Sequence, residues 1–552
     1  MKYKVLCEDK ELSLIDRLLK IRGISDNITN FLDPKLKDYW LNPRNLNDMK
    51  KWVDRILNAI KNKEKIMIFG DYDVDGVTSS FILYKFFTKY LNYKYVSIMY
   101  PDRIKDGYGM KNKHLDEIKE KWVDLVITVD NGITSIWEVK YAKKIWIDVI
   151  ITDHHKNLEE LPDAVAVINP IVSEKYRFKY LAGVWVVFKM ICALLDATNI
   201  FNINEKNKIF NYFLPIAAIG TVADIVPLVN ENRLIVKRWL ELMNNGREGM
   251  STALKWLLNY LNLKEVDTFH IGFVIGPRIN AWWRIDSPYN SLKMLLFTWE
   301  KQLEALKRID EINADRKKLQ EEAFKKSEES LDLEQKIIIS ESEDFHEWIV
   351  GIVSGKLTEK YHKPSVVFKI DKDKWHAVAS LRWPDYFDIV AMLQKYENLL
   401  ERFGWHKHAG WLTIKLDKLE EFKDKIIQHC NEYIKDEDLE KTLHIDTKIF
   451  DNEWNYDLIQ ELQKLAPFGE WNSEPNFLFE KVGVEKVEKV GKNGSWHMKI
   501  HWNFGDNKIK FLFWWKGDMI KNIEKEKEIN IVGKIKKDDF NWWYFVNGVE
   551  IL

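Results

Sequence analysis

Cysteine and glycine are both scarce in this chain of 552 residues, which contains 24 glycines. The whole chain has three cysteines, namely Cys7, Cys192 and Cys430. An odd number of scattered cysteines excludes a disulfide framework and a cysteine-rich metal knuckle, and favours a reducing compartment. Long apolar runs are also lacking: the best, residues 184–195, is too short to cross a bilayer and contains Lys189. Residues 1–10 have no apolar signal core. We therefore expect a cytoplasmic protein with no membrane segment.

The chain also has almost no net charge. The chain has 84 basic and 85 acidic side chains, a balance of −1. Nucleic-acid-binding proteins commonly carry a bulk positive charge, so affinity for nucleic acid here would require a local basic surface. Residues 481–552 offer one, because they contain 14 lysines against 10 acidic residues, with aromatic residues interleaved. This composition suits single strands that stack on aromatics and pair their phosphates with lysines, although most of the aromatics could equally form a core.

The most informative segment lies near residue 70. The apolar run of residues 66–69 precedes Asp71, Asp73 and Asp75 at alternate positions, and then Gly76. The run predicts a buried parallel strand, which would put the carboxylates at its carboxyl end, where ligands bind in open α/β sheets. Carboxylates crowded together repel one another unless cations neutralise them, so this pattern indicates a metal site.

Further acidic and histidine side chains follow other apolar runs. Asp130 follows residues 125–129, and Asp224 lies in the apolar segment 220–228. After the run of residues 147–152 come three such side chains: Asp153, His154 and His155. Carboxylates with imidazole and without thiolate suit Mn²⁺ or Mg²⁺. Because neutral histidine also binds zinc, ligand type alone leaves the metal open.

Together these motifs resemble the DHH phosphoesterase family and, within it, the RecJ single-strand exonucleases. The resemblance runs through most of the chain and includes the segments 101–103, 106–109, 181–184, 276–281, 346–347, 351–353, 404–410 and 467–475.

The resemblance implies a role for each residue of the metal motifs. It implies two divalent ions, Mn²⁺ or Mg²⁺, held by Asp73, Asp75, Asp130, His154 and Asp224. Asp130 would bridge the ions and help to hold the attacking hydroxide. His155 would face the scissile phosphate. Asp71 would orient one of the ligands without binding a metal ion itself. Phe69 stands where some relatives have a ligating histidine.

Residues of a second domain would hold the strand. The candidate phosphate binders are Arg278, Arg284, Arg382 and His406, and the backbone of Gly404 and Gly410 would allow close approach.

The alternation of strand-like and helical segments predicts an α/β protein with a parallel-sheet domain, a long connecting helix, a second, smaller α/β domain and a C-terminal OB-like β-barrel. The resemblance implies that the first of these is the DHH domain and that the second is of the DHH-associated type. The expected boundaries are an N-terminal helical extension at 1–50, the catalytic domain at 51–300, the connecting helix at 301–330, the substrate-binding domain at 331–435 and the barrel at 440–552.

The resemblance implies a 5′-to-3′ exonuclease on single-stranded DNA that serves recombination and repair, with a helicase or a single-strand-binding protein as partner. One alternative is a phosphodiesterase of short oligonucleotides or cyclic dinucleotides, and another is a non-enzymatic scaffold on the same fold. The predicted barrel favours long strands, and the intact acid–histidine set argues against a scaffold.

Tryptophan is as frequent as glycine, at 24 residues each. Glycine at its usual share would number about 39 in a chain of this length. Against the family patterns, tryptophan stands where glycine is expected at residues 137, 146, 185, 283, 348, 405, 411 and 471, with 383 and 496 as further candidates. We hypothesise that the gene uses UGA for glycine and that the codon has been read here as tryptophan. The alternative is a protein that uses tryptophans to stack bases.

Overall fold

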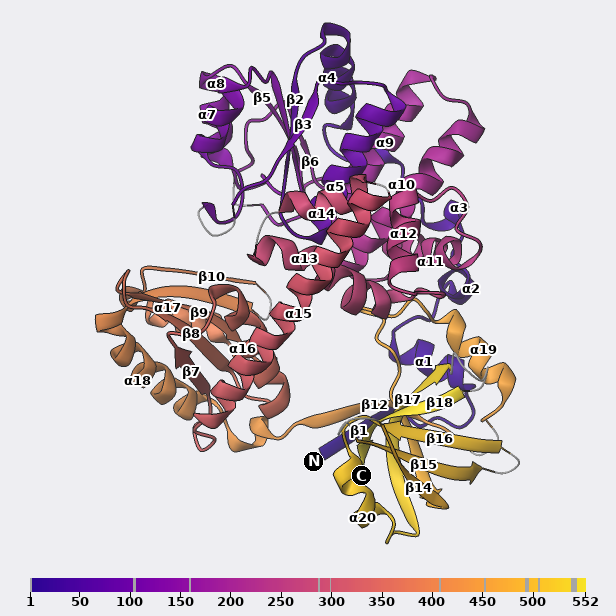
Figure 1. Cartoon of the computed structure of the whole chain (residues 1–552). Helices are drawn as coiled ribbons and strands as arrows, with labels where there is room; N and C mark the ends of the chain where they lie inside the picture. The colour runs from indigo at the N-terminus through magenta and orange to yellow at the C-terminus, as the bar shows by residue number, and fades with distance from the viewer. Residues whose placement is uncertain are drawn as a thin grey trace. The chain divides into compact units, whose positions relative to one another are not determined.

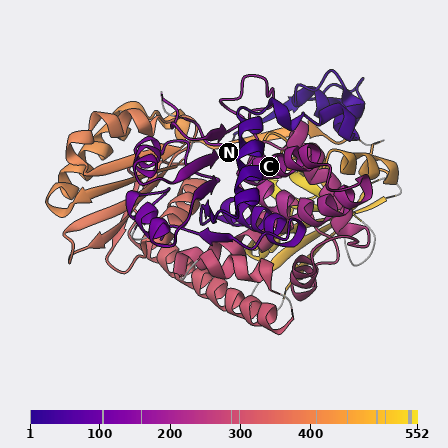
Figure 2. The ribbon, with the colours of Figure 1, turned by 90° about the horizontal axis from the view of Figure 1, so that it is seen from above.

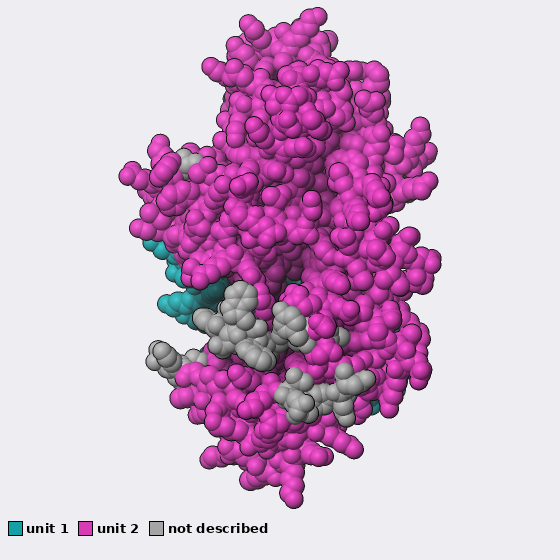
Figure 3. All heavy atoms as spheres, turned by 90° about the vertical axis from the view of Figure 1, so that its right-hand side faces the viewer, with its two compact units in different colours: residues 1–4, 311–444 teal, residues 5–310, 445–552 magenta. Residues whose placement is uncertain are grey.

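The computed structural model describes residues 2–102, 106–157, 160–285, 288–297, 299–406, 409–450, 453–491, 496–504, 507–537 and 544–552. The chain forms two compact units, coloured separately in Figure 3. The smaller unit contains Met1–Lys4 and Glu311–His444, and the larger contains Val5–Asp310 and Ile445–Leu552. Residues 445–552 therefore pack with residues 5–310, although residues 311–444 of the smaller unit separate them in sequence.

A five-stranded parallel sheet forms the centre of the larger unit. Its order is β3-β2-β4-β5-β6, with β2 (Ile66–Gly70), β3 (Val96–Met99), β4 (Leu125–Val129), β5 (Asp148–Thr152) and β6 (Ala166–Ile168). Strands β2 and β4 are buried along their whole length, as expected for apolar runs covered on both faces. The chain leaves β2 toward β3 on one side and β4 toward β5 on the other. The carboxyl ends of β2 and β4 therefore flank the switch point at which such sheets bind ligands.

Helices cover both faces of this sheet (Figure 1). On one face lie α7 (Asn112–Glu120) and α8 (Ile136–Lys144), which share an apolar cluster with β2, β4 and β5. On the other face lie α4 (Met49–Asn62), α5 (Val74–Lys85) and α9 (Gly183–Thr198). More helices follow in the chain: α10 (Ile203–Ala223), α11 (Asn230–Asn244), α12 (Thr252–Tyr260), α13 (Gly276–Ile285) and α14 (Pro288–Leu296).

The predicted connecting helix is present as α15 (Glu300–Glu329), seen in Figures 1 and 2. Its apolar face buries Leu306, Ile309 and Ile312, three of the residues whose spacing predicted it.

The smaller unit contains the second α/β fold. Its mixed sheet has the order β10-β11-β9-β8-β7, in which β7 and β8 are parallel and the other neighbours are antiparallel. Its elements are β7 (Ile338–Ser342), α16 (Glu347–Tyr361), β8 (Ser365–Asp371), β9 (His376–Arg382), α17 (Ile389–Lys395), β10 (Arg402–His406), β11 (Ala409–Lys415) and α18 (Leu416–Tyr433).

The C-terminal part is an eight-stranded sheet of the order β1-β12-β13-β17-β18-β16-β15-β14. Its bounds are β12 (Thr442–Lys448), α19 (Tyr456–Lys464), β13 (Phe477–Gly483), β14 (Lys486–Val490), β15 (His497–Phe504), β16 (Asn507–Phe513), α20 (Ile520–Ile523), β17 (Glu528–Lys537) and β18 (Tyr544–Ile551). Its aromatic and aliphatic core includes Phe479, Ile500 and Phe511.

One feature of the N-terminus differs from the prediction. Residues 1–50 were expected to be helical, and α1 (Leu14–Ile21), α2 (Ile28–Leu32) and α3 (Leu36–Tyr39) are, but β1 (Lys2–Cys7) is a strand of the C-terminal sheet. Its neighbour in the sheet, β12, lies near the other end of the chain, so no local pattern could indicate it. None of the described helices is both long enough and apolar enough to cross a membrane.

Candidate active site

The turn from β2 into α5 positions the three aspartates near residue 70. Asp73 is the N-cap of α5, and its Oδ1 accepts a hydrogen bond of 3.0 Å from the backbone N–H of Gly76. The turn is so tight that a Cβ on Gly76 would lie 2.3 Å from the carbonyl oxygen of Asp71. Asp75 lies in the first turn of the helix and is buried. The glycine after the aspartates is therefore a steric requirement of the turn.

Asp75 is held by the amino terminus of a second helix. Its two carboxylate oxygens accept hydrogen bonds from the backbone N–H groups of Gly183, at 2.6 Å, and Val184, at 2.8 Å, in the first turn of α9. A Cβ on Gly183 would lie 2.9 Å from Oδ1 of Asp130, so a larger residue would enter the space between these carboxylates. Burial and the nearby charge of Asp224 raise the pKa of Asp75 to about 7.

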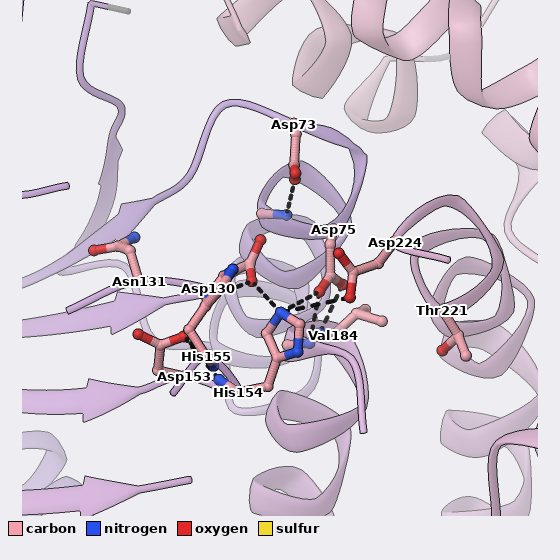
Figure 4. Close-up of polar contacts among 12 residues, drawn as sticks. Asp73, Asp75, Asp130, Asn131, Asp153, His154, His155, Val184, Thr221 and Asp224 are labelled. Carbon is pink, nitrogen blue, oxygen red and sulfur yellow. Dashed lines mark hydrogen bonds and ion pairs between the residues drawn. The ribbon is translucent and has the colours of Figure 1, made fainter. Parts of the chain in front are cut away.

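Four segments of the chain bring their side chains together here (Figure 4). Nε2 of His154, after β5, lies 3.1 Å from Oδ1 of Asp130, after β4. The same nitrogen lies 3.5 Å from Oδ2 of Asp224, the C-cap of α10, and 3.8 Å from Oδ2 of Asp75. Within the described residues, potential ligand atoms less than 4.8 Å apart form three overlapping groups: Asp130–His154–His155, Asp75–His154–Asp224 and Asp71–Asp73–Asp130. The structure thus brings all five predicted metal ligands, as well as Asp71 and His155, to one edge of the sheet.

The polar atoms at the centre of this cluster are suited to a cation. Asp130 Oδ1, His154 Nε2 and Asp224 Oδ2 are buried and form no hydrogen bond with the described residues. Burial, reinforced by the neighbouring His155, lowers the pKa of His154, which favours a neutral ring with a free lone pair. Burial and the surrounding carboxylates raise the pKa of Asp130 well above its ordinary range and that of Asp224 to about 8. Divalent cations would offset this repulsion and complete the coordination of the buried atoms.

Asp130 also has a left-handed backbone, with φ of 63°. Residues other than glycine seldom adopt this conformation outside turns, and where they do so the strain commonly accompanies a functional site. The backbone N–H of Asp130 donates to the carbonyl of Thr152, at the end of the neighbouring strand. The conformation therefore fixes this carboxylate between β2 and β5.

Two side chains orient His155, and neither had a predicted role. Asp153 accepts a hydrogen bond of 2.8 Å from the His155 ring, and the hydroxyl of Tyr108 lies 3.4 Å from the same Nδ1 and 3.2 Å from the carbonyl of Asp130. Burial alone would lower the pKa of His155, but the hydrogen bond and charge of Asp153 raise it to about 9. Both residues belong to motifs visible in the sequence, but only the fold shows that they converge on one imidazole.

The predicted phosphate binders lie in several places. Arg278, on α13, donates from Nε to Oδ1 of Asp310 at 2.7 Å, so the structure pairs it with a carboxylate. In the smaller unit Arg382, on β9, donates to the hydroxyl of Ser380 and the carbonyl of Leu381, and burial lowers its pKa. The side chains of Arg284 and His406 lie outside the described parts of the chain.

The two predicted glycines lie on neighbouring strands of the same sheet as Arg382. Gly404 on β10 pairs with Trp411 on β11, and Trp405 pairs with Gly410. A Cβ on Gly404 would lie 2.8 Å from Nε1 of Trp411, so the indole covers this stretch of backbone.

A parallel sheet that gathers aspartates and histidines at its switch point, together with a second α/β domain, defines a phosphoesterase of the DHH class. Family models match three parts of the chain: the DHH family N-terminal domain at 65–221, the DHHA1 domain at 334–432 and the RecJ OB domain at 445–542. The chain belongs to the RecJ family.

The chain is 33% identical to the single-stranded-DNA-specific exonuclease RecJ of Bacillus subtilis (strain 168), with 98% of this chain and 68% of the relative covered. Its identity to the RecJ of Haemophilus influenzae is 30%, with 88% and 86% covered. The crystal structure of RecJ in complex with Mn²⁺ from Thermus thermophilus has a TM-score of 0.83 at 23% identity, covering all of this chain and 79% of that one. The predicted fold class and family are thereby confirmed.

Proposed function

We propose that this protein hydrolyses phosphodiester bonds in single-stranded DNA as a metal-dependent exonuclease with 5′-to-3′ polarity. The observation that carries the proposal is the convergence of Asp75, Asp130, Asp224 and His154 on one another, with Nε2 of His154 between 3.1 and 3.8 Å from the three carboxylates. The relatives named as single-stranded-DNA-specific exonucleases support the choice of substrate.

Asp73, Asp75, Asp130, His154 and Asp224 would hold two divalent ions, Mn²⁺ or Mg²⁺. Such a pair of ions, when bound, supplies an activated water and neutralises charge on the scissile phosphate. The solved RecJ structures with Mn²⁺ and with Mg²⁺ support this choice of metals.

The side chains of the protein would hold the metal ligands in position and balance the charge of the substrate phosphate. Asp75, fixed by the first turn of α9, and Asp130, fixed by its left-handed backbone, keep their carboxylates in place without a large conformational change on binding. His155, whose pKa is raised by the hydrogen bond and charge of Asp153, would donate a hydrogen bond to a non-bridging phosphate oxygen. Asp71 would orient a ligand from behind.

The remaining parts would hold the strand. Arg278, Arg284, Arg382 and His406 would bind phosphates, with the backbone of Gly404 and Gly410 close by. The C-terminal barrel would add stacking and lysine contacts along a longer strand. A cytoplasmic protein that works in recombination and repair, alongside a helicase or a single-strand-binding protein, would fit this activity. The three cysteines, all buried thiols, suit a reducing compartment.

The experiment that tests the proposal uses the full chain with Mn²⁺ or Mg²⁺ and a series of single strands labelled at the 5′ end. We expect release of labelled mononucleotides from long strands, no release after chelation, and little cleavage of duplex. Cleavage confined to dinucleotides or short oligonucleotides would favour the alternative of a small-substrate phosphodiesterase. Label released only after the unlabelled 3′ part had been degraded would contradict the polarity.

A further inference from the structure

Among the residues that the structure describes, six tryptophans have a left-handed backbone. Positive φ values between 56° and 62° occur at Trp122, Trp146, Trp299, Trp375, Trp471 and Trp515. The other two aromatic residue types provide an internal comparison, because the chain has 28 phenylalanines and 21 tyrosines. None of those in the described segments has a positive φ. The left-handed conformation is therefore a property of the tryptophan positions and not of bulky aromatic residues in general.

Two of the six follow helices at the position where glycine is strongly preferred. After α7, the N–H of Trp122 donates to the carbonyl of Lys119, and the next N–H donates to Ile118. After α8, the N–H of Trp146 donates to the carbonyl of Lys143, and the next N–H donates to Ala142. Both pairs of bonds form the Schellman motif, which ends a helix through a left-handed residue that is usually glycine because it has no Cβ.

Two others close tight turns between paired segments. Trp375 is the last residue of the loop between β8 and β9, directly before His376, which pairs with Asp371. Trp471 is the second residue of a two-residue turn whose flanking residues, Gly469 and Asn472, exchange both backbone hydrogen bonds. In the turn at Trp471, the positive φ lies at the second central position, where a type II turn requires it and where glycine or asparagine normally stands.

The side chains of the six tryptophans gain little from burial. All six are at least half exposed, and the most exposed, Trp146, retains 86% of its possible surface. By contrast Trp52 and Trp239, which lie within helices, are completely buried. Apolar burial is the usual reason for a tryptophan, so strain without burial needs another explanation.

We propose that the natural protein carries glycine at these six positions, because its gene encodes them with UGA and its cell translates UGA as glycine. One reassigned codon accounts for all six strained positions at once, whereas ordinary substitution requires six independent events. Four of the six, Trp122, Trp299, Trp375 and Trp515, are found from backbone conformation alone and do not depend on any family pattern. Glycine at these six positions would also raise the glycine count of the chain from 24 toward the ~39 expected at the usual share.

The proposal is confined to these positions. Trp137, Trp185, Trp405 and Trp411 lie in helices or strands, where the backbone angles do not distinguish glycine from tryptophan. Trp185 is buried and stacks on Phe188 with 4.7 Å between ring centroids.

The decisive measurement combines the gene with the protein made in its own cells. We expect UGA codons at all six positions, and native peptides spanning them that are lighter by the difference between tryptophan and glycine. The buried Trp52 and Trp239 serve as controls, for which we expect UGG codons and tryptophan-containing peptides. UGG codons at the six positions, or native peptides with tryptophan there, would overturn the proposal.

A second measurement needs only recombinant full-length protein. Replacing all six tryptophans with glycine should raise the midpoint of thermal unfolding by at least ~2 °C, because six strained residues are relieved. The matched control is Trp256→Gly in the interior of α12, which should lower the midpoint because glycine weakens a helix. A six-glycine protein that unfolds at a lower temperature than the tryptophan form would contradict the proposal.

Discussion

The Nδ1 atom of His155 lies 2.8 Å from Oδ1 of Asp153, a carboxylate that is completely buried. The same Oδ1 accepts the backbone N–H groups of His154 and His155, and Oδ2 accepts that of Ile133 at 2.9 Å. Burial would raise the pKa of Asp153, but these donors and the His155 ring hold it below its ordinary value. A charged carboxylate in a fixed position therefore sets both the orientation and the charge of the imidazole.

Replacement of this carboxylate by an amide should change the pH dependence of hydrolysis. In Asp153→Asn the pKa of His155 should fall from about 9, because the charge and hydrogen bond that raise it are lost. The alkaline limb of the kcat profile should then move to lower pH, and the rate should drop by about 10- to 100-fold, a loss typical when the hydrogen-bond partner of an active-site imidazole is removed. Strand binding should be unchanged.

The same pair should also affect stability. The pKa of His155 rises from near 6.5 in the unfolded chain to about 9 in the folded protein. Its contribution to stability is therefore fully present below pH 6.5 and is lost as the pH rises through 9. Asp153→Asn should therefore narrow the difference in stability between pH 6 and pH 10. The control is Asp163→Asn, which changes an exposed partner of Lys143.

For the kinetic prediction, an unchanged kcat profile in Asp153→Asn would contradict the role of Asp153 in setting the charge of His155.

Removal of the central carboxylate should abolish both metal binding and cleavage. For wild-type protein, Mn²⁺ at 100 times its dissociation constant should add about 2.7 kcal/mol to the free energy of unfolding. In Asp130→Ala this increment should largely disappear and hydrolysis should be lost, whereas equilibrium binding of a single strand should persist. Asp54→Ala, at an exposed partner of Lys50, is the control. Cleavage by Asp130→Ala near the wild-type rate would refute the role of this residue.

Arg233 should stabilise the packing of the C-terminal part against the catalytic part of the larger unit. Its buried guanidinium donates to the backbone carbonyls of Phe31, Lys464, Leu465, Ala466 and Pro467. Burial lowers its pKa to about 9. Arg233→Met leaves these carbonyls without their donor and should cost about 3 kcal/mol of unfolding free energy in guanidinium chloride.

The matched control for this change lies on the same helix. Arg238, with a side chain 73% exposed, pairs with Glu241 one turn away. Arg238→Met should cost less than about 0.5 kcal/mol. Equal losses of unfolding free energy for the two variants would mean that the buried guanidinium contributes no more to stability than the exposed one.

Lysines on the outer face of the barrel should contribute to strand binding. Met498 and Ile500 on β15 point into the core, so Lys499 between them points outward, and Lys508 and Lys510 alternate in the same way on β16. Replacing the three lysines with alanine should weaken binding of a long single strand. The slope of log K against log salt should decrease by about 2, since each phosphate contact on a single strand contributes roughly 0.7.

Charge removal elsewhere provides the comparison for this prediction. Lys50, Lys143 and Lys418 each pair with a nearby carboxylate, and their triple replacement by alanine should leave the salt slope unchanged. If both triple variants shift the slope equally, the effect is one of net charge and not of the barrel surface.

Glycine at the two tryptophans beside Gly404 and Gly410 should improve the recombinant enzyme. Trp405 and Trp411 are half exposed, and the Trp411 indole covers the backbone of Gly404. Trp405→Gly with Trp411→Gly should lower the KM for long strands, because the backbone near Arg382 becomes open to phosphate. A KM that rises in the double variant would show that these indoles bind bases instead.

Local sequence patterns were enough to predict a metal site and the class of the fold. Apolar runs that end in Asp130 or in the pair His154–His155 form strands because they are buried on both faces, and the carboxyl ends of parallel strands lie at one edge. The regular apolar spacing of residues 303–319 likewise predicted α15. These signals are local, since each depends on a single strand or helix and its flanking residues.

The contacts between residues distant in the sequence were visible only in the folded structure. Three such contacts join residues that are far apart in the chain: the hydrogen bonds from the first turn of α9 to Asp75, the pairing of Arg278 with Asp310, and the position of β1 beside β12. Such contacts depend on how whole elements pack, and no periodicity in the sequence encodes them. Left-handed tryptophans such as Trp146 also became visible only in the fold, because the backbone angle is set by the bonds that close the helix and not by the side chain.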